Sequence, residues 1–363
     1  MNICFLCRGF TANGGIGRVT SIIANYLAEN ENVNILLCSF SDEKADENYY
    51  ISPKCTHEFL YDKPITMTNA LIKRHAVKKL SQFLIRYKID IIISCGVIYN
   101  PLAVVAARKC KIKVVCWEHT NPNNKADYRF QDQSRVIGAR FSDCNVVLTK
   151  AALEEYNHRF PRSKNIHIYN PVDPDLYTHA GSYNITSKRI ISVGRLRPQK
   201  NFDRLLDIAA EVLPHLNGWT WDVYGEGELR EHLQEKRDRL GLNDKINFKG
   251  QVGDLYDRYQ NYAFMVMTSD YEGFPMTLLE GAANSLPLVA FDVPTGPSEI
   301  IVADYNGCLC KNGDNAGMVS AIKRLASDDG YRKMMSDGSK KTSEEFQVKM
   351  ITKQWIRLFE ELI

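Results

Sequence analysis

Short apolar runs alternate with helical patterns along nearly the whole sequence, and this alternation restricts the chain to α/β architectures. One series opens with the apolar run 2–7, which is followed by an amphipathic stretch that ends near Asn30. A second series opens with the run 189–193 and continues with an amphipathic stretch over 202–213. Since 363 residues suffice for two domains of ordinary size, the sequence predicts two α/β units, each built on a parallel sheet.

A boundary between the two units is expected in the Pro-rich segment 170–174 and the polar stretch 181–187. The first unit then covers residues 1–172 and the second covers residues 187–342, with a terminal helical stretch over 343–363. Asp173 and Asp175 flank a proline in this segment and form an acid pair. Because Asp and Pro favour turns, we interpret the pair as turn chemistry rather than as a metal site.

The composition excludes several classes of protein. Hydrophobic residues make up 44% and charged residues 25% of the sequence, as in ordinary globular proteins, and a formal net charge of +3 is too small to indicate a nucleic-acid partner. The longest apolar region, 89–107, contains Asp90, Asn100 and Pro101, so it predicts a strand, a turn and a helix rather than a membrane span. The N-terminal run lacks the features of a signal peptide, and the ten cysteines lack disulfide or zinc spacing. These features favour a cytoplasmic protein.

A loop with two carboxylates is the strongest candidate site. It follows the apolar run 263–267, and residues 272–280 read Glu-Gly-Phe-Pro-Met-Thr-Leu-Leu-Glu. Glu272 and Glu280 bracket the expected start of a helix near Thr277. Helix starts expose N–H groups and a positive dipole end, and carboxylates accept hydrogen bonds from hydroxyls, so this loop suits a sugar attached to phosphate. The alternative is structural, because Thr277 and Glu280 also match a capping box.

A second candidate loop is rich in cationic residues. Residues 194–201, which read Gly-Arg-Leu-Arg-Pro-Gln-Lys-Asn, connect the run 189–193 to a predicted helix. Arg195, Arg197 and Lys200 therefore crowd a place where the helix dipole is already positive. Their mutual repulsion is relieved either by exposure to solvent or by a bound anion, and a diphosphate is the natural guest.

Glycine-bearing loops follow two further apolar runs. Gly14 and Gly15 come after the run 2–7, and Gly225 and Gly227 come after the run 221–224. Glycine lets the backbone approach a ligand closely. Both loops lack the third glycine of the dinucleotide fingerprint, which argues against an NAD-dependent oxidoreductase. After the run 246–249, Val252 lies in a turn that could present backbone groups to a base.

Polar residues also follow the apolar run 113–117, in the order Glu118, His119, Thr120 and Asn121. A single histidine is usually structural. Ligands of α/β folds bind at the carboxyl ends of parallel strands, however, so the position favours a functional role for His119.

A basic amphipathic helix is predicted over 68–88. Its inward positions include Ala76, Leu80 and Leu84, and its basic residues are Lys73, Arg74, His75, Lys78, Lys79, Arg86 and Lys88. Such a helix can lie on an anionic membrane surface, or it can be an ordinary solvated surface helix.

In their order along the chain, these motifs resemble the retaining glycosyltransferases of family 4. The matching residues cover almost the whole sequence and comprise Gly14-Gly15, Glu118-His119, Gly194-Arg195-Leu196 with Lys200-Asn201, the stretch 225–229, and Glu272 with Glu280. The resemblance implies the GT-B fold, in which two Rossmann-like domains with parallel sheets face each other across a cleft. It also implies that the terminal helix packs back on the N-terminal domain, which would bind the acceptor.

The resemblance further implies roles for single residues. Arg195 and Lys200 would hold the donor diphosphate and stabilise the leaving nucleotide, and Glu280 would bond the ribose. His119 would contact the transferred sugar from the N-terminal domain. Gly14 and Gly15 would let their loop close near the diphosphate. The sugar itself would be held by Glu272 and by the loop of Gly273, Phe274, Pro275, Met276 and Thr277.

One position departs from the family pattern. Pro275 stands where the family often has glycine, and proline has no N–H to offer a sugar hydroxyl. That contact must shift to Phe274, Met276 or Thr277, which leaves the choice of sugar open. Retention of configuration rests on the resemblance alone, with front-face attack assisted by the leaving phosphate as the mechanism consistent with the family.

The predicted function is transfer of a hexose or N-acetylhexosamine from a nucleotide sugar, expected to be UDP-linked, to a glycan or lipid-linked oligosaccharide. The short patterns 118–121, 272–275 and 294–299 are similar to enzymes that build bacterial surface polysaccharides, including lipopolysaccharide. No metal or other cofactor is expected. The alternatives are another GT-B enzyme, such as a sugar-nucleotide epimerase, and a non-catalytic sugar-nucleotide-binding partner. A peripheral location on the inner face of the cell membrane would follow if the basic helix 68–88 binds lipid.

Overall fold

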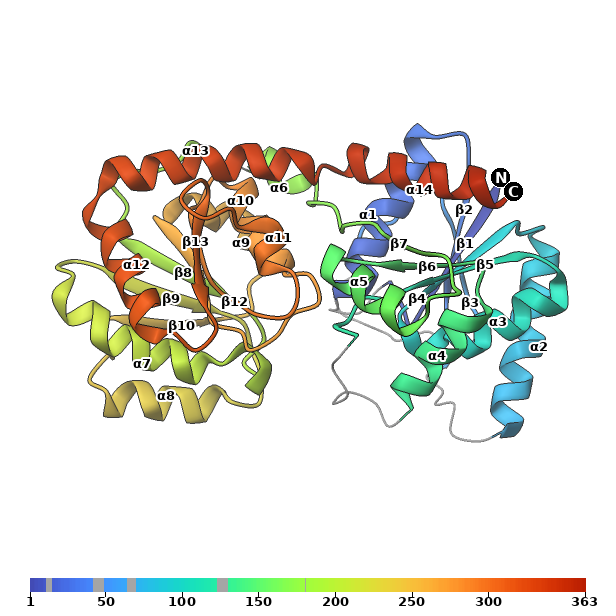
Figure 1. Ribbon diagram of the computed structural model, residues 1–363, viewed down its shortest axis with the longest axis horizontal. Coiled ribbons are helices and arrows are strands. Elements are labelled where there is room, and N and C mark those ends of the chain that lie inside the picture. The colour runs from blue at the N-terminus through green and yellow to red at the C-terminus, as the bar shows by residue number, and fades with distance from the viewer. Residues whose placement is uncertain (11–14, 42–48, 64–69, 123–129, 180) are drawn as a thin grey trace. The chain divides into compact units, whose positions relative to one another are not determined.

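The computed structural model describes residues 1–10, 15–41, 49–63, 70–122, 130–179 and 181–363 (Figure 1). These residues form two compact units. Unit 1 comprises Met1–Pro171 and Val348–Ile363, and unit 2 comprises Val172–Gln347. In each unit, helices cover both faces of a sheet whose paired strands run parallel, which confirms the predicted α/β class.

Unit 1 contains a seven-stranded sheet in the order β3-β2-β1-β4-β5-β6-β7. Its strands are β1 Asn2–Cys7, β2 Asn34–Ser39, β3 Thr56–Phe59, β4 Ile91–Cys95, β5 Lys113–Trp117, β6 Cys144–Val147 and β7 Asn165–His167. Its helices are α1 Gly15–Asn30, α2 Ala70–Arg86, α3 Asn100–Cys110, α4 Gln131–Phe141, α5 Lys150–Arg159 and α14 Val348–Leu362, with a short 3₁₀ turn, η1 Val97–Tyr99.

The central strands of unit 1 are buried on both faces. Every residue of β4 is buried, and so is every residue of β1 after Asn2. A strand covered on both sides has no polar face, which explains why these runs are continuously apolar rather than alternating. Their carboxyl ends therefore carry the first residues of each run that can reach a ligand.

Unit 2 contains a six-stranded sheet in the order β10-β9-β8-β11-β12-β13. Its strands are β8 Arg189–Val193, β9 Thr220–Tyr224, β10 Ile246–Gly250, β11 Phe264–Met267, β12 Leu288–Asp292 and β13 Gly307–Lys311. Its helices are α6 Asp175–His179, α7 Phe202–Val212, α8 Arg230–Arg239, α9 Leu255–Arg258, α10 Met276–Ala283, α11 Pro297–Ile300, α12 Asn315–Ser327 and α13 Asp329–Glu345. Three 3₁₀ turns accompany them, η2 Pro198–Lys200, η3 Leu213–His215 and η4 Tyr259–Asn261.

The two ends of unit 2 lie next to each other. Val172 forms a parallel bridge with Gln347, and its N–H donates to the carbonyl of Phe346 at 2.8 Å. Of the two stretches expected to form the boundary, residues 172–174 and 181–187 therefore belong to unit 2, and the short helix α6 lies between them. The terminal helix begins at Val348 rather than at 343, because α13 continues to Glu345.

The final helix α14 packs within unit 1 through a buried face that includes Trp355 and Phe359. The Trp355 ring centroid lies 4.9 Å from that of Trp117 on β5 and 6.4 Å from that of Phe5 on β1. Burial of an aromatic side chain of this size dominates the local packing free energy. Among the described residues, the helices are all too short or too polar to cross a bilayer.

Candidate functional site

The strongest site lies in unit 2 where two neighbouring strands end. β8 and β11 pair directly, so the loops that follow them, 194–201 and 268–275, leave the sheet side by side. This is the edge at which parallel α/β sheets bind ligands. The fold thereby brings together the cationic loop and the loop with two carboxylates. The residues that meet, Lys200 and Glu272, are 72 positions apart in the sequence.

An ion pair joins these two loops. Lys200 Nζ lies 2.6 Å from Glu272 Oε1, and the two side chains are 19% and 7% exposed. Glu272 thus offsets one of the three charges that crowd the cationic loop, while Arg195 and Arg197 are exposed. The pair places an ammonium and a carboxylate within reach of one ligand, the first suited to phosphate and the second to hydroxyl groups.

The backbone around Lys200 is held by its neighbours. Thr268 Oγ1 donates to the carbonyls of Lys200 and Asn201, each at 3.1 Å. Asn201 adopts a left-handed conformation with φ of 46°, and its side chain caps α7 by accepting from the N–H of Arg204. Its amide group also donates to Asp270 Oδ1 at 2.8 Å. The loop is therefore fixed before any ligand binds.

A third loop, which follows β12, holds the carboxylate loop in place. The N–H of Glu272 donates to Pro294 at 3.1 Å, and the N–H of Thr295 donates back to Glu272 at 3.0 Å. The Thr295 hydroxyl donates to the carbonyl of Gly273 at 2.9 Å. Gly296 has a φ of 100°, and a Cβ there would lie 2.6 Å from Pro275 Cδ, so only glycine fits. The sequence pattern 294–299 indicated only a resemblance to other enzymes, and its contact with the carboxylate loop was not predicted.

The start of α10 corrects the capping-box alternative. The helix begins at Met276 with Pro275 as its N-cap, and no described side chain caps it. Thr277 is already inside the helix, two residues after the N-cap position, so its hydroxyl does not cap it. Glu280 Oε2 instead accepts from Tyr259 Oη at 2.7 Å, with both residues buried. Tyr259 is a site residue that no local sequence signal revealed.

The glycines of the loop after β9 have a packing role. Gly225 has a φ of 133°, and a Cβ there would lie 1.9 Å from the carbonyl oxygen of Gly194. A Cβ on Gly227 would lie 2.4 Å from the carbonyl oxygen of Leu196. These two glycines let the loop pack against the cationic loop, which explains them without a dinucleotide. Val252 follows β10, which is separated from β8 by β9.

In unit 1, the residues after β5 form a buried polar network around Glu118. Its Oε2 accepts from Arg135 Nε at 2.7 Å and from Tyr156 Oη at 3.0 Å, and its Oε1 accepts from the Thr120 hydroxyl at 2.6 Å. The side chains of Arg135 and Glu118 are 1% and 3% exposed. A buried charge needs such partners, so Glu118 serves to fix the strand end rather than to meet a ligand.

His119 is held at that strand end with a buried ring nitrogen. Its ring centroid lies 4.1 Å from that of Trp117, and its Nε2 has no hydrogen-bond partner among the described residues. Burial lowers the pKa of His119 to about 3, so the imidazole is neutral at physiological pH. A neutral ring can exchange a hydrogen bond with a ligand but is a poor proton acceptor.

Of the two glycines predicted to lie near the diphosphate, the structure describes Gly15. Gly14 lies outside the described residues. Gly15 is the first residue of α1 and is exposed, and a Cβ there would meet no atom within 4 Å. Gly17, which sequence reasoning did not single out, is the constrained one, because its Cβ would lie 2.8 Å from the carbonyl oxygen of Gly9.

The acid pair of Asp173 and Asp175 forms a turn. Asp173 Oδ1 accepts from the N–H of Asp175 at 3.1 Å, and Asp173 Oδ2 accepts from Tyr256 Oη at 2.9 Å. These bonds match the turn interpretation. The predicted site residues that the structure describes thus fall into two groups, Gly15 and His119 in unit 1 and the others in unit 2.

Comparisons with known proteins agree across the chain. Residues 13–176 match the family model "Glycosyltransferase Family 4", and residues 180–342 match "Glycosyl transferases group 1". An uncharacterized glycosyltransferase of Haemophilus influenzae is 25% identical over 97% of this chain and 98% of its own length. The amylovoran biosynthesis glycosyltransferase AmsD of Erwinia amylovora is 27% identical over 97% and 98% of the two chains.

Solved structures show the same fold. The lipopolysaccharide outer core galactosyltransferase WaaB in its apo form has a TM-score of 0.80 and 22% identity, with all of both chains covered. Anabaena Alr3699/HepE in complex with UDP and glucose has a TM-score of 0.82 and 19% identity, with 99% of both chains covered. With two family models that span most of the sequence and a shared two-sheet architecture, the chain belongs to glycosyltransferase family 4 and has the GT-B fold.

Proposed function

We propose that this glycosyltransferase moves a hexose or N-acetylhexosamine, with retention of configuration, from a UDP-sugar to a glycan or lipid-linked oligosaccharide of the bacterial surface. The printed names of its relatives support this role. They include the amylovoran enzyme and the lipopolysaccharide 1,6-galactosyltransferase of Escherichia coli, which is 27% identical over 68% of this chain. Structural neighbours bound to UDP or UDP-glucose support the choice of nucleotide.

The observation that carries the proposal is the Lys200–Glu272 pair beside the start of α10. In the proposed complex, Lys200 Nζ and the Arg195 guanidinium contact the donor diphosphate. Glu272 and the N–H groups of the loop before α10 hold the sugar hydroxyls, and Glu280 holds the ribose. Pro275 has no N–H, so the backbone donors are those of its neighbours Phe274, Met276 and Thr277. Val252 would lie toward the base.

The pair also accounts for how the reaction would be driven. When the glycosidic C–O bond breaks, negative charge grows on the leaving phosphate oxygen, where Lys200 and Arg195 stabilise it. The acceptor hydroxyl attacks the anomeric carbon from the same face and passes its proton to that oxygen. Two cationic side chains supply the charge that a divalent ion supplies in other transferases, so we propose that the reaction needs no metal.

His119 contributes a hydrogen bond rather than proton transfer in this scheme. Its low pKa keeps the ring neutral, and the ring that carries its buried Nε2 packs against Trp117. We propose that this nitrogen bonds a hydroxyl of the transferred sugar.

A thermal-shift screen tests the donor. UDP and its cognate sugar should raise the unfolding temperature, because a ligand that binds only the native state stabilises it. Arg195→Ala should abolish both the shift and UDP release during turnover while keeping the fold, and EDTA should have no effect. Normal turnover by Arg195→Ala would refute the diphosphate assignment. Interconversion of two UDP-sugars without UDP release would favour an epimerase instead.

We further propose that α2 contacts an anionic membrane. Lys73, Arg74 and Lys78 are exposed on it, and it also exposes two large apolar side chains, Leu71 at 76% and Ile85 at 66%. Charged and apolar groups together are what an interfacial helix needs.

Lys79 is a poor test position for this contact. Its Nζ donates to the carbonyl of Leu60 at 3.1 Å and lies over the Tyr61 ring, so its charge is already in use. Arg74→Glu with Lys78→Glu should release the protein from phosphatidylglycerol vesicles. Lys340→Glu with Lys341→Glu, the same charge change on exposed residues of unit 2, should not. Equal release by both pairs would refute a specific role for α2.

A further inference from the structure

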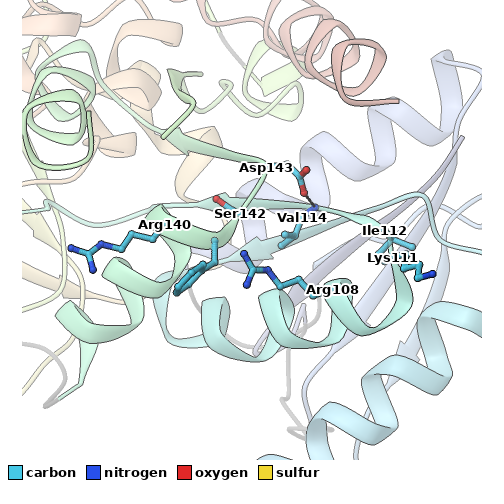
Figure 2. A pocket seen from close by; sticks show the side chains of 8 residues that line it. Arg108, Lys111, Ile112, Val114, Arg140, Ser142 and Asp143 are labelled. Carbon is cyan, nitrogen blue, oxygen red and sulfur yellow. Dashed lines mark hydrogen bonds between the residues drawn. The ribbon is translucent and has the colours of Figure 1, made fainter. Parts of the chain in front are cut away.

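Unit 1 contains a cavity of about 350 Å³ at the edge of its sheet opposite His119 (Figure 2). It lies where β5 begins, whereas His119 follows the point where β5 ends. The lining comes from the end of α3, the start of β5, and the end of α4 with the turn after it. This volume is within the range of small-molecule sites. Because α/β folds bind substrates at the other edge, the cavity is separate from the candidate site described above.

The cavity is lined by three cations and one carboxylate. Arg108, Lys111 and Arg140 carry the positive charges, and none of them pairs with a carboxylate among the described residues. Asp143 is already in use, because it accepts from the N–H of Val114 at 2.9 Å and lies 3.2 Å from Lys113 Nζ. The cavity therefore has an excess of hydrogen-bond donors and of positive charge.

An aromatic ring supports one of these cations. The Arg108 guanidinium lies 4.5 Å from the ring centroid of Phe141, a residue that is 44% exposed. Stacking on a ring holds the planar group by its face and leaves the N–H groups at its edge for an anion. An exposed phenylalanine next to unpaired cations is typical of a surface that a ligand covers in part.

The surrounding surface has the same sign. Residues 70–113 contain ten Lys or Arg residues and one acidic residue, Asp90, whereas the whole chain has 46 basic and 43 acidic residues. This segment supplies α2 and α3, which pack against each other. Arg108 and Lys111 of this basic segment line the cavity, and the excess positive charge of α2 and α3 would attract an anion toward this part of unit 1.

Favourable interaction with helix dipoles is the alternative explanation for these cations. Arg108 and Arg140 lie in the last turns of α3 and α4, where a positive charge is stabilising. Lys111 is the C-cap of α3, with a φ of 59°, so the same dipole stabilises its charge. Helix dipoles do not, however, explain a cavity with an exposed ring in it. We propose that this cavity binds a phosphate group, carried either by a lipid headgroup or by a small soluble molecule.

Binding to two probes distinguishes the two sources. The full-length protein would be titrated with glycerol 3-phosphate and, separately, with phosphatidylglycerol vesicles, with phosphatidylcholine vesicles as the uncharged control. Binding to glycerol 3-phosphate identifies a soluble ligand, and binding to the anionic vesicles alone identifies a headgroup. The vesicle titration is made on Arg74→Glu with Lys78→Glu, so that the contact proposed for α2 does not contribute. Failure to bind either probe would overturn the proposal.

Variants then locate the site. Arg108→Ala with Arg140→Ala should weaken binding about tenfold or more, since two charge-assisted hydrogen bonds are lost. Lys340→Ala with Lys341→Ala changes the net charge equally and should have less than about a twofold effect. Phe141→Leu keeps the charge and should still weaken binding, which a diffuse electrostatic surface would not predict. If the double variant unfolds, Lys111→Ala replaces it in the binding assay, because Lys111 follows the last residue of α3. Equal losses in the cavity and control pairs would refute the site.

Discussion

The Lys200–Glu272 ion pair predicts that a second substitution will restore nucleotide binding lost through the first. A diphosphate in contact with Lys200 Nζ, at about 2.8 Å, lies within about 5 Å of the Glu272 carboxylate, which is 2.6 Å from the same nitrogen. Like charges about 5 Å apart repel by about 3 kcal/mol at an effective dielectric constant of about 20. In the native protein, Lys200 lies between them and offsets this repulsion.

Lys200→Ala should therefore weaken UDP binding in two ways, by removing the cation and by exposing the diphosphate to an uncompensated carboxylate. Adding Glu272→Gln removes the repulsion. The double variant should bind UDP about tenfold to 100-fold more tightly than Lys200→Ala, which corresponds to about 1 to 3 kcal/mol. The recovery should not extend to sugar transfer, because Glu272 is proposed to hold the sugar.

Isothermal titration with UDP alone, on the native protein, both single variants and the double variant, measures this coupling. Lys236→Ala with Asp207→Asn breaks another ion pair of unit 2, with a 2.8 Å separation, and should leave UDP affinity unchanged. If the double variant binds UDP no better than Lys200→Ala, the diphosphate does not lie beside this pair and the placement of the donor is wrong.

Three other changes test the supporting structure. Gly225→Ala should destabilise unit 2 by more than about 3 kcal/mol, because the new Cβ would overlap the Gly194 carbonyl. A Cβ at Gly253 would meet no atom within 4 Å, so Gly253→Ala should be tolerated. Thermal unfolding of the two variants measures the difference. Arg135→Met should lower the free energy of unfolding by about 3 to 5 kcal/mol, measured with urea, because it leaves Glu118 buried without its cation. Arg159→Met, at a partly exposed ion pair, is the control, and an equal loss of stability there would contradict this account. His119 has a folded pKa of about 3, below its ordinary value of 6.5, so its stabilising contribution is present above pH 6.5 and is lost as the pH falls. Between pH 6 and pH 4 the native protein should lose more stability than His119→Asn, by up to about 1.4 kcal/mol per pH unit, and parallel curves would show that His119 is not desolvated.

Local sequence patterns predicted the architecture well. The runs 113–117 and 189–193 are strands β5 and β8 with the expected bounds. A strand buried on both faces must be apolar along its length, and a helix between two such strands must be amphipathic, so both leave a signal within a few residues. The start of the terminal helix was wrong, since α13 and α14 meet at a short break whose position depends on packing rather than on composition.

The sequence alone determined that polar residues stand after particular strands, because a loop is recognisable from its own composition. It left the capping-box alternative for Glu280 undecided. Only the tertiary structure showed which of these residues meet. The order β9-β8-β11-β12 brings the loops at 200, 225, 272 and 295 together, and that order is set by sheet packing over the whole unit. The bonds from Lys200 to Glu272, from Thr295 to Gly273 and from Tyr259 to Glu280 join residues 72, 22 and 21 positions apart. Contacts over such separations depend on the direction in which each side chain leaves its element, and no local pattern records that direction.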